Sequence, residues 1–268
     1  MSRALELAAR GTGMTFPNPL VGAVVVSGGE IAGEGFHEGA GRPHAEVVAL
    51  GEAGERARGG VLYCNLEPCC HHGRTPPCTD AIAAAGISRV EYAIHDPDVR
   101  VMGKGARRLR ELGIEAVGGL MAGEAIELNL PYVHRRLTGR PFIVLKLALT
   151  LDGRLAGGGE RYLTCEASRG CVHGLRACME AIAIGSGTLR ADDPELDRRL
   201  FPGCLGPPVR MVFDSGLSLD PGHRWLGRGE PVIVYCGRKA DPGRVARLRD
   251  AGAEVVPLPA ADGGLDLG

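Results

Sequence analysis

Two stretches decide the fold of the first half of the chain: Pro43-His44-Ala45-Glu46-Val47 and Glu67-Pro68-Cys69-Cys70-His71-His72-Gly73-Arg74-Thr75-Pro76-Pro77-Cys78-Thr79-Asp80. The imidazole of His44 and the thiols of Cys69 and Cys78 are ligands that Zn²⁺ accepts. Three protein ligands leave the fourth tetrahedral position free for water. In zinc deaminases a glutamate two residues after the histidine moves protons without binding the metal. Glu46 holds that place, so the pattern predicts a zinc-dependent deaminase.

The surrounding sequence predicts how these residues are held. Short apolar runs predict buried strands over 21–26 and 61–66, and Ala-rich segments with start and stop signals predict helices over 45–53 and 79–85. Metal ligands then lie at the N-terminal ends of two helices, where the helix dipole favours a thiolate. The alternatives are a zinc site that only stabilises the fold, which would need a fourth ligand, and thiols that pack as small hydrophobic groups.

Composition limits the class of protein. The 268 residues allow one large domain or two modest ones, and 31 Lys and Arg against 32 Asp and Glu give a net charge of −1. A near-neutral chain with one Trp, five Tyr and five Phe lacks the basic surface and the stacking platforms of a nucleic-acid binder. No apolar run approaches the ~20 residues that cross a bilayer. Nine cysteines without a disulfide framework favour the reducing cytoplasm.

Strand and helix patterns alternate along the rest of the chain, which predicts an α/β protein with helices on both faces of a mixed sheet. The turn residues Thr138-Gly139-Arg140-Pro141 suggest a boundary between domains at 1–140 and 141–268. In the first half we expect strands over 89–94 and 115–117 and helices over 106–112 and 122–137, the last kinked at Pro131. In the second half we expect strands over 142–149, 180–185, 209–213 and 232–235 and helices over 172–179 and 245–251.

Eight residues separate Cys69 from Cys78, whereas the general deaminase signature has Pro-Cys-x-x-Cys. With this insert, the stretch from Asn65 to Asp80 closely resembles the deaminase half of the bifunctional riboflavin-biosynthesis deaminase/reductases. The same family is suggested by the motifs Pro17-Asn18-Pro19-Leu20-Val21-Gly22, Leu145-Lys146-Leu147-Ala148, Leu151-Asp152-Gly153-Arg154 and Thr188-Leu189-Arg190-Ala191-Asp192-Asp193-Pro194.

The resemblance implies a cytidine-deaminase-like three-layer α/β/α domain followed by a dihydrofolate-reductase-like α/β domain. The first would use one Zn²⁺ to deaminate 2,5-diamino-6-ribosylamino-4(3H)-pyrimidinone 5′-phosphate. The second would use NADPH to reduce the ribosyl side chain to ribityl. The partner is thus a small phosphorylated pyrimidine, with no nucleic acid and no membrane, and we expect a homo-oligomer.

Site residues follow from the resemblance by position. It assigns NADP contacts to Ala148, Tyr162, Thr188, Asp192 and Ser215, and substrate contacts to Asn18, Arg176, Leu196 and Arg199. From the residues alone, Asn18 is also a plausible turn residue, and Gly185-Ser186-Gly187-Thr188 is as typical of an ordinary turn as of a phosphate-binding one. The basic loop of His71, His72 and Arg74 is a second candidate for contact with the phosphate.

Two departures from the family bear on these expectations. Tyr162 stands where the family usually has Trp, and relatives continue well beyond the position of Gly268. We therefore expect a truncated reductase half with impaired activity. Two other functions stay open: another zinc-dependent nucleoside or tRNA deaminase, and a zinc-binding relative without catalytic activity.

Overall fold

The computed structural model describes residues 1–73, 75–155, 163–198, 206–261 and 264–266. Contacts between Cα atoms separate two units, Met1–Leu147 and Ala148–Gly268. No helix among the described residues has the length and apolar character needed to cross a bilayer.

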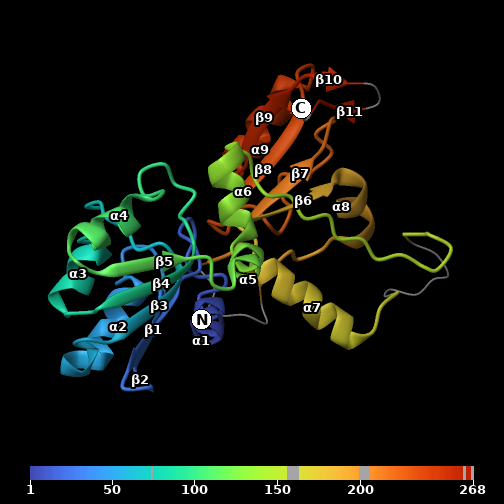
Figure 1. Cartoon of the computed structure of the whole chain (residues 1–268). Helices are drawn as coiled ribbons and strands as arrows, with labels where there is room; N and C mark the ends of the chain where they lie inside the picture. The colour runs from blue at the N-terminus through green and yellow to red at the C-terminus, as the bar shows by residue number, and fades with distance from the viewer. Residues whose placement is uncertain (74, 156–162, 199–205, 262–263, 267–268) are drawn as a thin grey trace. The chain divides into compact units, whose positions relative to one another are not determined.

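The first unit is built on a five-stranded mixed sheet (Figure 1). Strand β1 (Gly22–Ser27) lies between β2 (Glu30–Phe36) and β3 (Val61–Leu66) and is antiparallel to both. The sheet continues in parallel through β4 (Arg89–Ile94) to β5 (Glu115–Gly118). Parallel β3, β4 and β5 direct their carboxyl ends to one edge of the sheet, and loops at such an edge commonly carry the ligand site.

Helices cover both faces of this sheet. Alternate side chains of β1 point to opposite faces: Ala23 and Val25 join the main core, whereas Val24 packs against Ala4 and Leu7. The main core also holds side chains of α2 (Ala45–Ala53), α3 (Cys78–Ala84) and α4 (Lys104–Glu111), and the smaller core is covered by α1 (Ser2–Ala9). This arrangement and the parallel second sheet confirm the predicted α/β class.

Glycine allows α2 to approach the sheet closely. A Cβ atom on Gly33 or Gly35 of β2 would lie 2.2 Å or 2.5 Å from a backbone oxygen of α2. Any larger residue would push α2 away from the sheet, and α2 carries Glu46.

Several expected elements have the predicted bounds, including α2, β3 and β4. The helix expected over 122–137 is divided at Asn129 into α5 (Ala122–Leu128) and α6 (Leu130–Thr138), and Pro131 occupies the first turn of α6, where its missing N–H costs no hydrogen bond. The short 3₁₀-helix Gly54–Ala57, α1 and β2 were not predicted.

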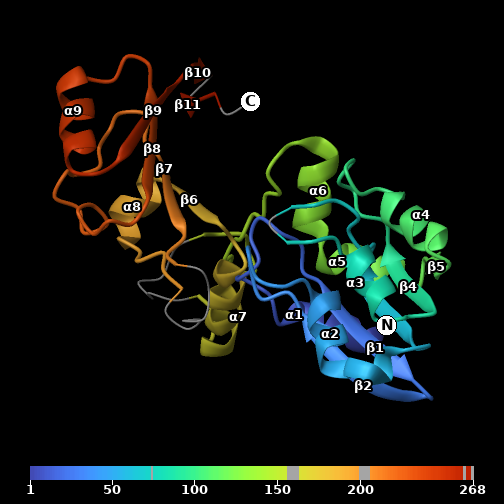
Figure 2. The same cartoon turned by 90° about the vertical axis from the view of Figure 1, so that its left-hand side faces the viewer.

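The second unit contains a parallel four-stranded sheet in the order β6 (Ala181–Gly185), β7 (Val209–Phe213), β8 (Val232–Gly237) and β9 (Glu254–Leu258), whose strands lie side by side in Figure 2. Its helices are α7 (Glu166–Ala177), α8 (Ser186–Asp192) and α9 (Pro242–Asp250). A short hairpin pairs β10 (Ala260–Ala261) with β11 (Gly264–Leu265). The core of the second unit contains Trp225 and Leu248, together with Val212 and Val234.

The strand expected over 142–149 is wrong, because the structure has no regular element there. Ile143 and Leu145 are 82 % and 81 % exposed, and no described strand pairs with this segment. An alternating apolar pattern suits a strand, but a strand also needs a partner for its backbone hydrogen bonds. A turn was expected over 185–188, but a helix stands there, because α8 begins at Ser186 directly after β6.

Candidate active site

The three predicted metal ligands meet beside the main core. His44 is the residue that caps the N-terminus of α2, Cys78 begins α3, and Cys69 follows β3 in the connecting loop. His44 Nδ1 lies 3.1 Å from Cys78 Sγ and 3.5 Å from Cys69 Sγ. All three ligand atoms are within 4.8 Å of one another.

These residues fit zinc. Bond lengths of about 2.0–2.3 Å place neighbouring ligand atoms of a tetrahedral zinc roughly 3.5–3.8 Å apart. His44 Nδ1 lies at a similar spacing from the two sulfur atoms, 3.1 Å and 3.5 Å. His44 turns Nδ1 toward the thiols, while its Nε2 lies 3.2 Å from Thr75 Oγ1. A hydrogen bond on the second ring nitrogen fixes the orientation of a metal-binding histidine.

Cys69 and Cys78 shift each other's pKa in opposite directions. Hydrogen bonds with Cys78 and with His44 together lower the pKa of Cys69 to about 4, against the opposing effect of burial. The same interaction with Cys69, together with burial, raises the pKa of Cys78. One thiolate is thus formed before a metal arrives, and metal binding would displace the proton that remains on the second thiol.

Glu46 lies in the first turn of α2 and is 4 % exposed. Burial raises the pKa of its carboxyl group, and the negative charge of Cys69 raises it further. Because general acid–base catalysis is most effective when the pKa lies near the working pH, this shift suits a group that accepts and then returns a proton.

The metal ligands and Glu46 line a pocket of about 550 Å³, within the ~300–1,000 Å³ typical of small-molecule sites. Asn18 lines the same pocket, and its Nδ2 is 3.0 Å from Nε2 of His37. His37 Nδ1 is 3.1 Å from the carbonyl oxygen of Pro43. If His37 donates to Pro43, it accepts from Asn18 Nδ2, which leaves Asn18 Oδ1 as the acceptor for a ligand.

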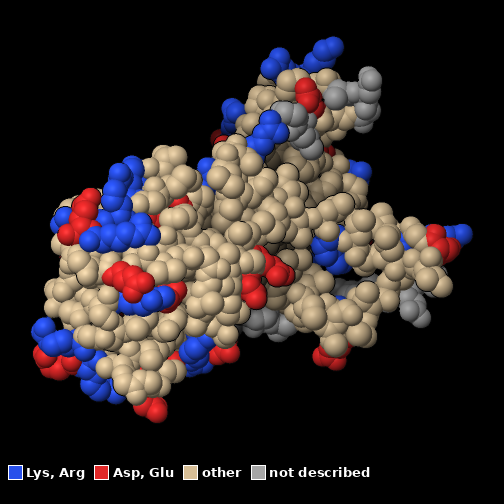
Figure 3. Space-filling view, viewed as in Figure 1, with Lys and Arg blue, Asp and Glu red and all other residues tan. Residues whose placement is uncertain are grey.

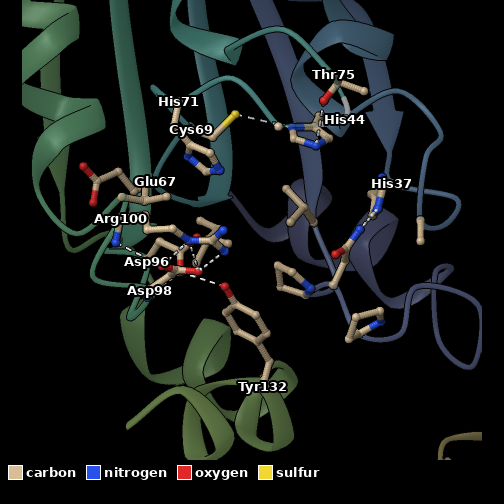
Figure 4. Close-up of a pocket in the computed structure, with 18 of the residues that line it drawn as sticks. His37, His44, Glu67, Cys69, His71, Thr75, Asp96, Asp98, Arg100 and Tyr132 are labelled. Atoms are coloured by element: carbon tan, nitrogen blue, oxygen red, sulfur yellow. Dashed lines mark hydrogen bonds and ion pairs between the residues drawn. The ribbon is translucent and has the colours of Figure 1, made fainter.

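The opposite wall of the pocket is formed by residues that the sequence did not indicate. In Figure 4, Asp96, Asp98 and Arg100 form one group with Tyr132, across the pocket from His44, Cys69 and Thr75. The Tyr132 hydroxyl donates to Asp96 Oδ1 at 2.8 Å, and the Asp98 backbone N–H donates to the same oxygen at 2.9 Å. Asp96 and Asp98 follow β4 at its carboxyl end, so strand order could have suggested their place, but Tyr132 arrives from α6, distant in sequence.

Glu67 anchors the loop that carries Cys69. Its side chain has 0 % exposure and accepts hydrogen bonds from the backbone N–H groups of Gly103 and Ala106, both at 2.9 Å, at the start of α4. Oε2 also lies 2.8 Å from His95 Nδ1. A negative carboxylate at a helix N-terminus is favourable, and here it ties the ligand loop to α4.

The basic loop is only partly in the pocket. His71 lines it, and its Nδ1 is buried without a hydrogen-bond partner among the described residues, whereas His72 is exposed. Arg74 lies outside the described residues.

In the second unit, three of the five predicted cofactor residues lie after the carboxyl ends of parallel strands. Thr188 and Asp192 lie on α8 directly after β6, and Ser215 follows β7. Ala148 lies in the irregular segment before the sheet. Of the predicted substrate residues, Arg176 is in α7 and Leu196 is buried with φ 49°. Tyr162 and Arg199 lie outside the described residues.

The loop after α8 is held by side chains from the 223–225 segment. Trp225 Nε1 donates to the carbonyl oxygen of Pro194 at 3.1 Å, and His223 Nε2 lies 2.9 Å from Asp193 Oδ1. Asp193 and Leu196 both have positive φ, a strained conformation that packing must stabilise. Sequence reasoning missed this network because its partners are about 30 residues apart.

Charged side chains are interspersed on the face of the molecule shown in Figure 3. Lys and Arg lie beside Asp and Glu there, in agreement with the net charge of −1.

Each half of the chain matches a known protein family. The model of the cytidine and deoxycytidylate deaminase zinc-binding region matches residues 1–94, and that of the RibD C-terminal domain matches residues 141–266. The chain is 48 % identical over 237 residues to the riboflavin biosynthesis protein RibD of Escherichia coli and 45 % identical over 260 residues to that of Aquifex aeolicus. These matches cover 84 % and 96 % of this chain and 65 % and 72 % of the two relatives.

Solved structures give the same result. A RibD structure from Acinetobacter baumannii has a TM-score of 0.86 at 38 % identity, covering 97 % of this chain and 73 % of that one. A diaminohydroxyphosphoribosylaminopyrimidine deaminase/5-amino-6-(5-phosphoribosylamino)uracil reductase from Thermotoga maritima has a TM-score of 0.82 at 38 % identity, covering 96 % and 79 %. These relationships confirm a deaminase zinc-binding region in the first half of the chain and a RibD C-terminal domain in the second. The chain belongs to the RibD family of bifunctional riboflavin-biosynthesis enzymes.

Proposed function

We propose that the first unit hydrolyses the amino group of 2,5-diamino-6-ribosylamino-4(3H)-pyrimidinone 5′-phosphate. The observation that supports this most directly is a buried carboxyl group, Glu46, in the same pocket as a set of three zinc ligands. Three ligands leave a position for water, which a structural zinc site does not.

The protein residues divide the chemistry between them. Zinc held by His44, Cys69 and Cys78 would supply a Lewis acid that lowers the pKa of water. Glu46 accepts a proton from the attacking water and returns it to the departing amino group. One water is consumed, the amino group leaves as ammonia, and an oxo group takes its place. The raised pKa of Glu46 favours the acceptance of the proton from water.

Asn18 and His37 orient the pyrimidine in this proposal. Asn18 Oδ1 accepts from an amino group of the ring, and His37 keeps the Asn18 amide in that orientation. A fixed orientation contributes to the rate because the reacting carbon is held at the metal end of the pocket.

We assign deamination to residues 1–140 and reduction to residues 141–268. For the second activity we propose NADPH contacts from Ala148, Tyr162, Thr188, Asp192 and Ser215, and substrate contacts from Arg176, Leu196 and Arg199. Thr188, Asp192 and Ser215 support this, because they lie at the carboxyl ends of neighbouring parallel strands, where nucleotides commonly bind. A homo-oligomer in the cytoplasm stays a prediction.

The deaminase assignment is tested by ammonia release from the zinc-loaded chain. We expect release from the ribosylamino-pyrimidine phosphate and not from free cytidine, and Glu46→Gln should keep one zinc per chain yet lose at least about 100-fold in kcat. Preference for cytidine would favour another nucleoside deaminase. A wild-type chain that binds zinc but releases no ammonia from either compound would be a non-catalytic relative, and full activity of the Gln variant would show that Glu46 has another role.

A further inference from the structure

The chain has three asparagines and no glutamine, so Asn18, Asn65 and Asn129 are its only carboxamide side chains. Asn18 lines the pocket of the first unit. Asn65 is near the end of β3, and Asn129 stands at the junction between α5 and α6. Although they come from distant parts of the sequence, Asn65 and Asn129 both bond the short segment 20–22, which directly follows Asn18 and Pro19.

Asn129 and Asn65 bond the backbone of this segment as a neighbouring strand would. Asn129 Oδ1 accepts from the Leu20 N–H at 2.8 Å, and Asn129 Nδ2 donates to the Leu20 carbonyl oxygen at 2.9 Å. Asn65 Nδ2 donates to the same carbonyl oxygen at 2.8 Å, and Asn65 Oδ1 accepts from the Gly22 N–H at 2.8 Å. In an antiparallel ladder, a residue exchanges the same two backbone groups with its partner. Two carboxamide groups therefore hold residues 20–22 in the manner of an additional strand.

The same segment is bonded to the residue that orients Asn18. The His37 backbone N–H donates to the Val21 carbonyl oxygen at 2.9 Å. The side chain of His37 also contacts Asn18, with 3.0 Å between Nε2 and Nδ2. A displacement of the segment would disturb both contacts, because Asn18 is only three residues from Val21. The direction of Asn18 Oδ1 therefore depends on where the segment is held.

The two side chains that hold the segment do not reach the pocket. Asn65 and Asn129 are buried, and neither is among the described residues that line the pocket. Buried carboxamides are normally found with their hydrogen bonds satisfied, and each of these two makes one bond as donor and one as acceptor. Because neither side chain lines the pocket, their effect on a bound ligand must pass through the segment.

We propose that Asn129 positions Asn18 for the deaminase substrate, and that the junction of α5 and α6 is thereby a part of the deaminase site. This inference rests on the proposed function, in which Asn18 Oδ1 accepts from the pyrimidine ring. Asn129 is a positioning residue that acts through the backbone of Leu20, and Asn65 supports the same segment from β3. Asn129 lies beyond residues 1–94, which match the deaminase zinc-binding region. The metal motifs therefore do not include this contribution.

A double-mutant cycle tests whether Asn129 acts through Asn18. Asn129→Leu removes both bonds to Leu20 at similar side-chain volume. It should lower kcat/KM for ammonia release from the ribosylamino-pyrimidine phosphate by about 10- to 100-fold, because the ring is no longer held in one orientation. Asn18→Ala should lower kcat/KM at least as much, and the double variant should be no worse than Asn18→Ala alone. Losses that multiply in the double variant would overturn the proposal.

The matched control for stability is Ile87→Val, which removes one buried methyl group just before β4. It should lower the urea midpoint of unfolding and leave kcat/KM unchanged. Equal zinc content and circular dichroism show that each variant is folded. If Asn129→Leu does not fold, Asn129→Asp replaces it in every measurement, because it keeps the acceptor for the Leu20 N–H and loses the donor to the carbonyl oxygen.

A spectroscopic test needs no turnover and so separates this proposal from the proposed function. Selective ¹⁵N labelling of asparagine gives three side-chain NH₂ signal pairs, and Asn18→Ala identifies the pair of Asn18. In zinc-loaded Asn129→Leu, the Asn18 pair should shift and exchange its hydrogens with solvent at least about 10-fold faster, whereas Ile87→Val should match the wild type. An unchanged Asn18 pair in Asn129→Leu would overturn the proposal even if deamination occurs. A shifted pair in a protein that releases no ammonia from any compound would sustain the positioning of Asn18 and reject the deaminase assignment.

Discussion

Gly105→Ala tests whether the start of α4 positions the metal ligand Cys69. Gly105 is in the first turn of α4, and a Cβ atom there would lie 2.0 Å from the carbonyl oxygen of Pro68, the residue before Cys69. Ordinary contacts between carbon and oxygen are about 3.3–3.6 Å. The helix and the ligand loop must therefore separate by more than about 1 Å.

The size of the effect follows from three contributions. Overpacking lowers the free energy of unfolding by about 1–3 kcal/mol, whereas alanine in place of glycine inside a helix raises it by about 1 kcal/mol. Separation also strains the bonds from Gly103 and Ala106 to Glu67, each of which contributes about 1 kcal/mol. We expect a net loss of about 2 kcal/mol in the free energy of unfolding. Because zinc ligands must lie within about 0.2 Å of their ideal distances, we also expect zinc affinity to fall by about 10- to 100-fold.

The control is the same substitution, glycine to alanine, at a helical position with free space around it. A Cβ atom on Gly51 of α2 would meet nothing within 4 Å. Gly51→Ala should therefore stabilise the chain by up to about 1 kcal/mol and leave zinc affinity unchanged. Urea unfolding measures the stability, and competition with a chromophoric chelator measures zinc affinity. If Gly105→Ala binds zinc as tightly as Gly51→Ala and is equally stable, α4 does not position Cys69.

Two further changes test the metal site and the far wall of the pocket. Cys78→Ala should reduce the zinc content from one per chain to almost none by elemental analysis, since only two ligands remain. Retention of stoichiometric zinc by this variant would exclude Cys78 as a ligand. A chelator should also abolish ammonia release by the wild type, and added zinc should restore it. Asp98→Asn should lower the free energy of unfolding most at neutral pH, because the native pKa of Asp98 is depressed and its contribution is present above the unfolded value of about 3.9. The difference in unfolding free energy between the wild type and the variant should shrink as the pH falls below about 4 toward the native pKa. Urea unfolding at pH 7, 4 and 3 measures it. A difference that grows with acidity would mean that Asp98 is not held by Arg100.

The sequence predicts the metal end of the pocket well because its determinants are local. The strand β3 is a mostly apolar run that ends just before Glu67, α2 begins directly after His44, and α3 begins at Cys78. Each of these signals involves residues within one turn or one strand of the ligand they position. The short spacing between His44 and Glu46 also identifies the reaction class, since the chemistry requires both groups at one metal.

The second unit shows where local patterns are insufficient. The 142–149 segment has the alternation of a strand, but the sheet of the second unit is formed by β6 to β9 without it. Its exposed Ile143 and Leu145 cannot be foreseen from residue type, because burial depends on a pairing partner distant in sequence. The network around Asp193 and Trp225 was missed for the same reason.

The two walls of the deaminase pocket therefore carry different information. The metal wall is specified by short motifs, which is why it resembles the zinc region of cytidine and deoxycytidylate deaminases. The far wall combines the loop after β4 with α6, whose sequence lies beyond that region, at residues 130–138. A pocket that discriminates between substrates needs groups that only the correct substrate satisfies. If the far wall supplies those groups, substrate choice can change by substitution there while the metal ligands and Glu46 stay fixed.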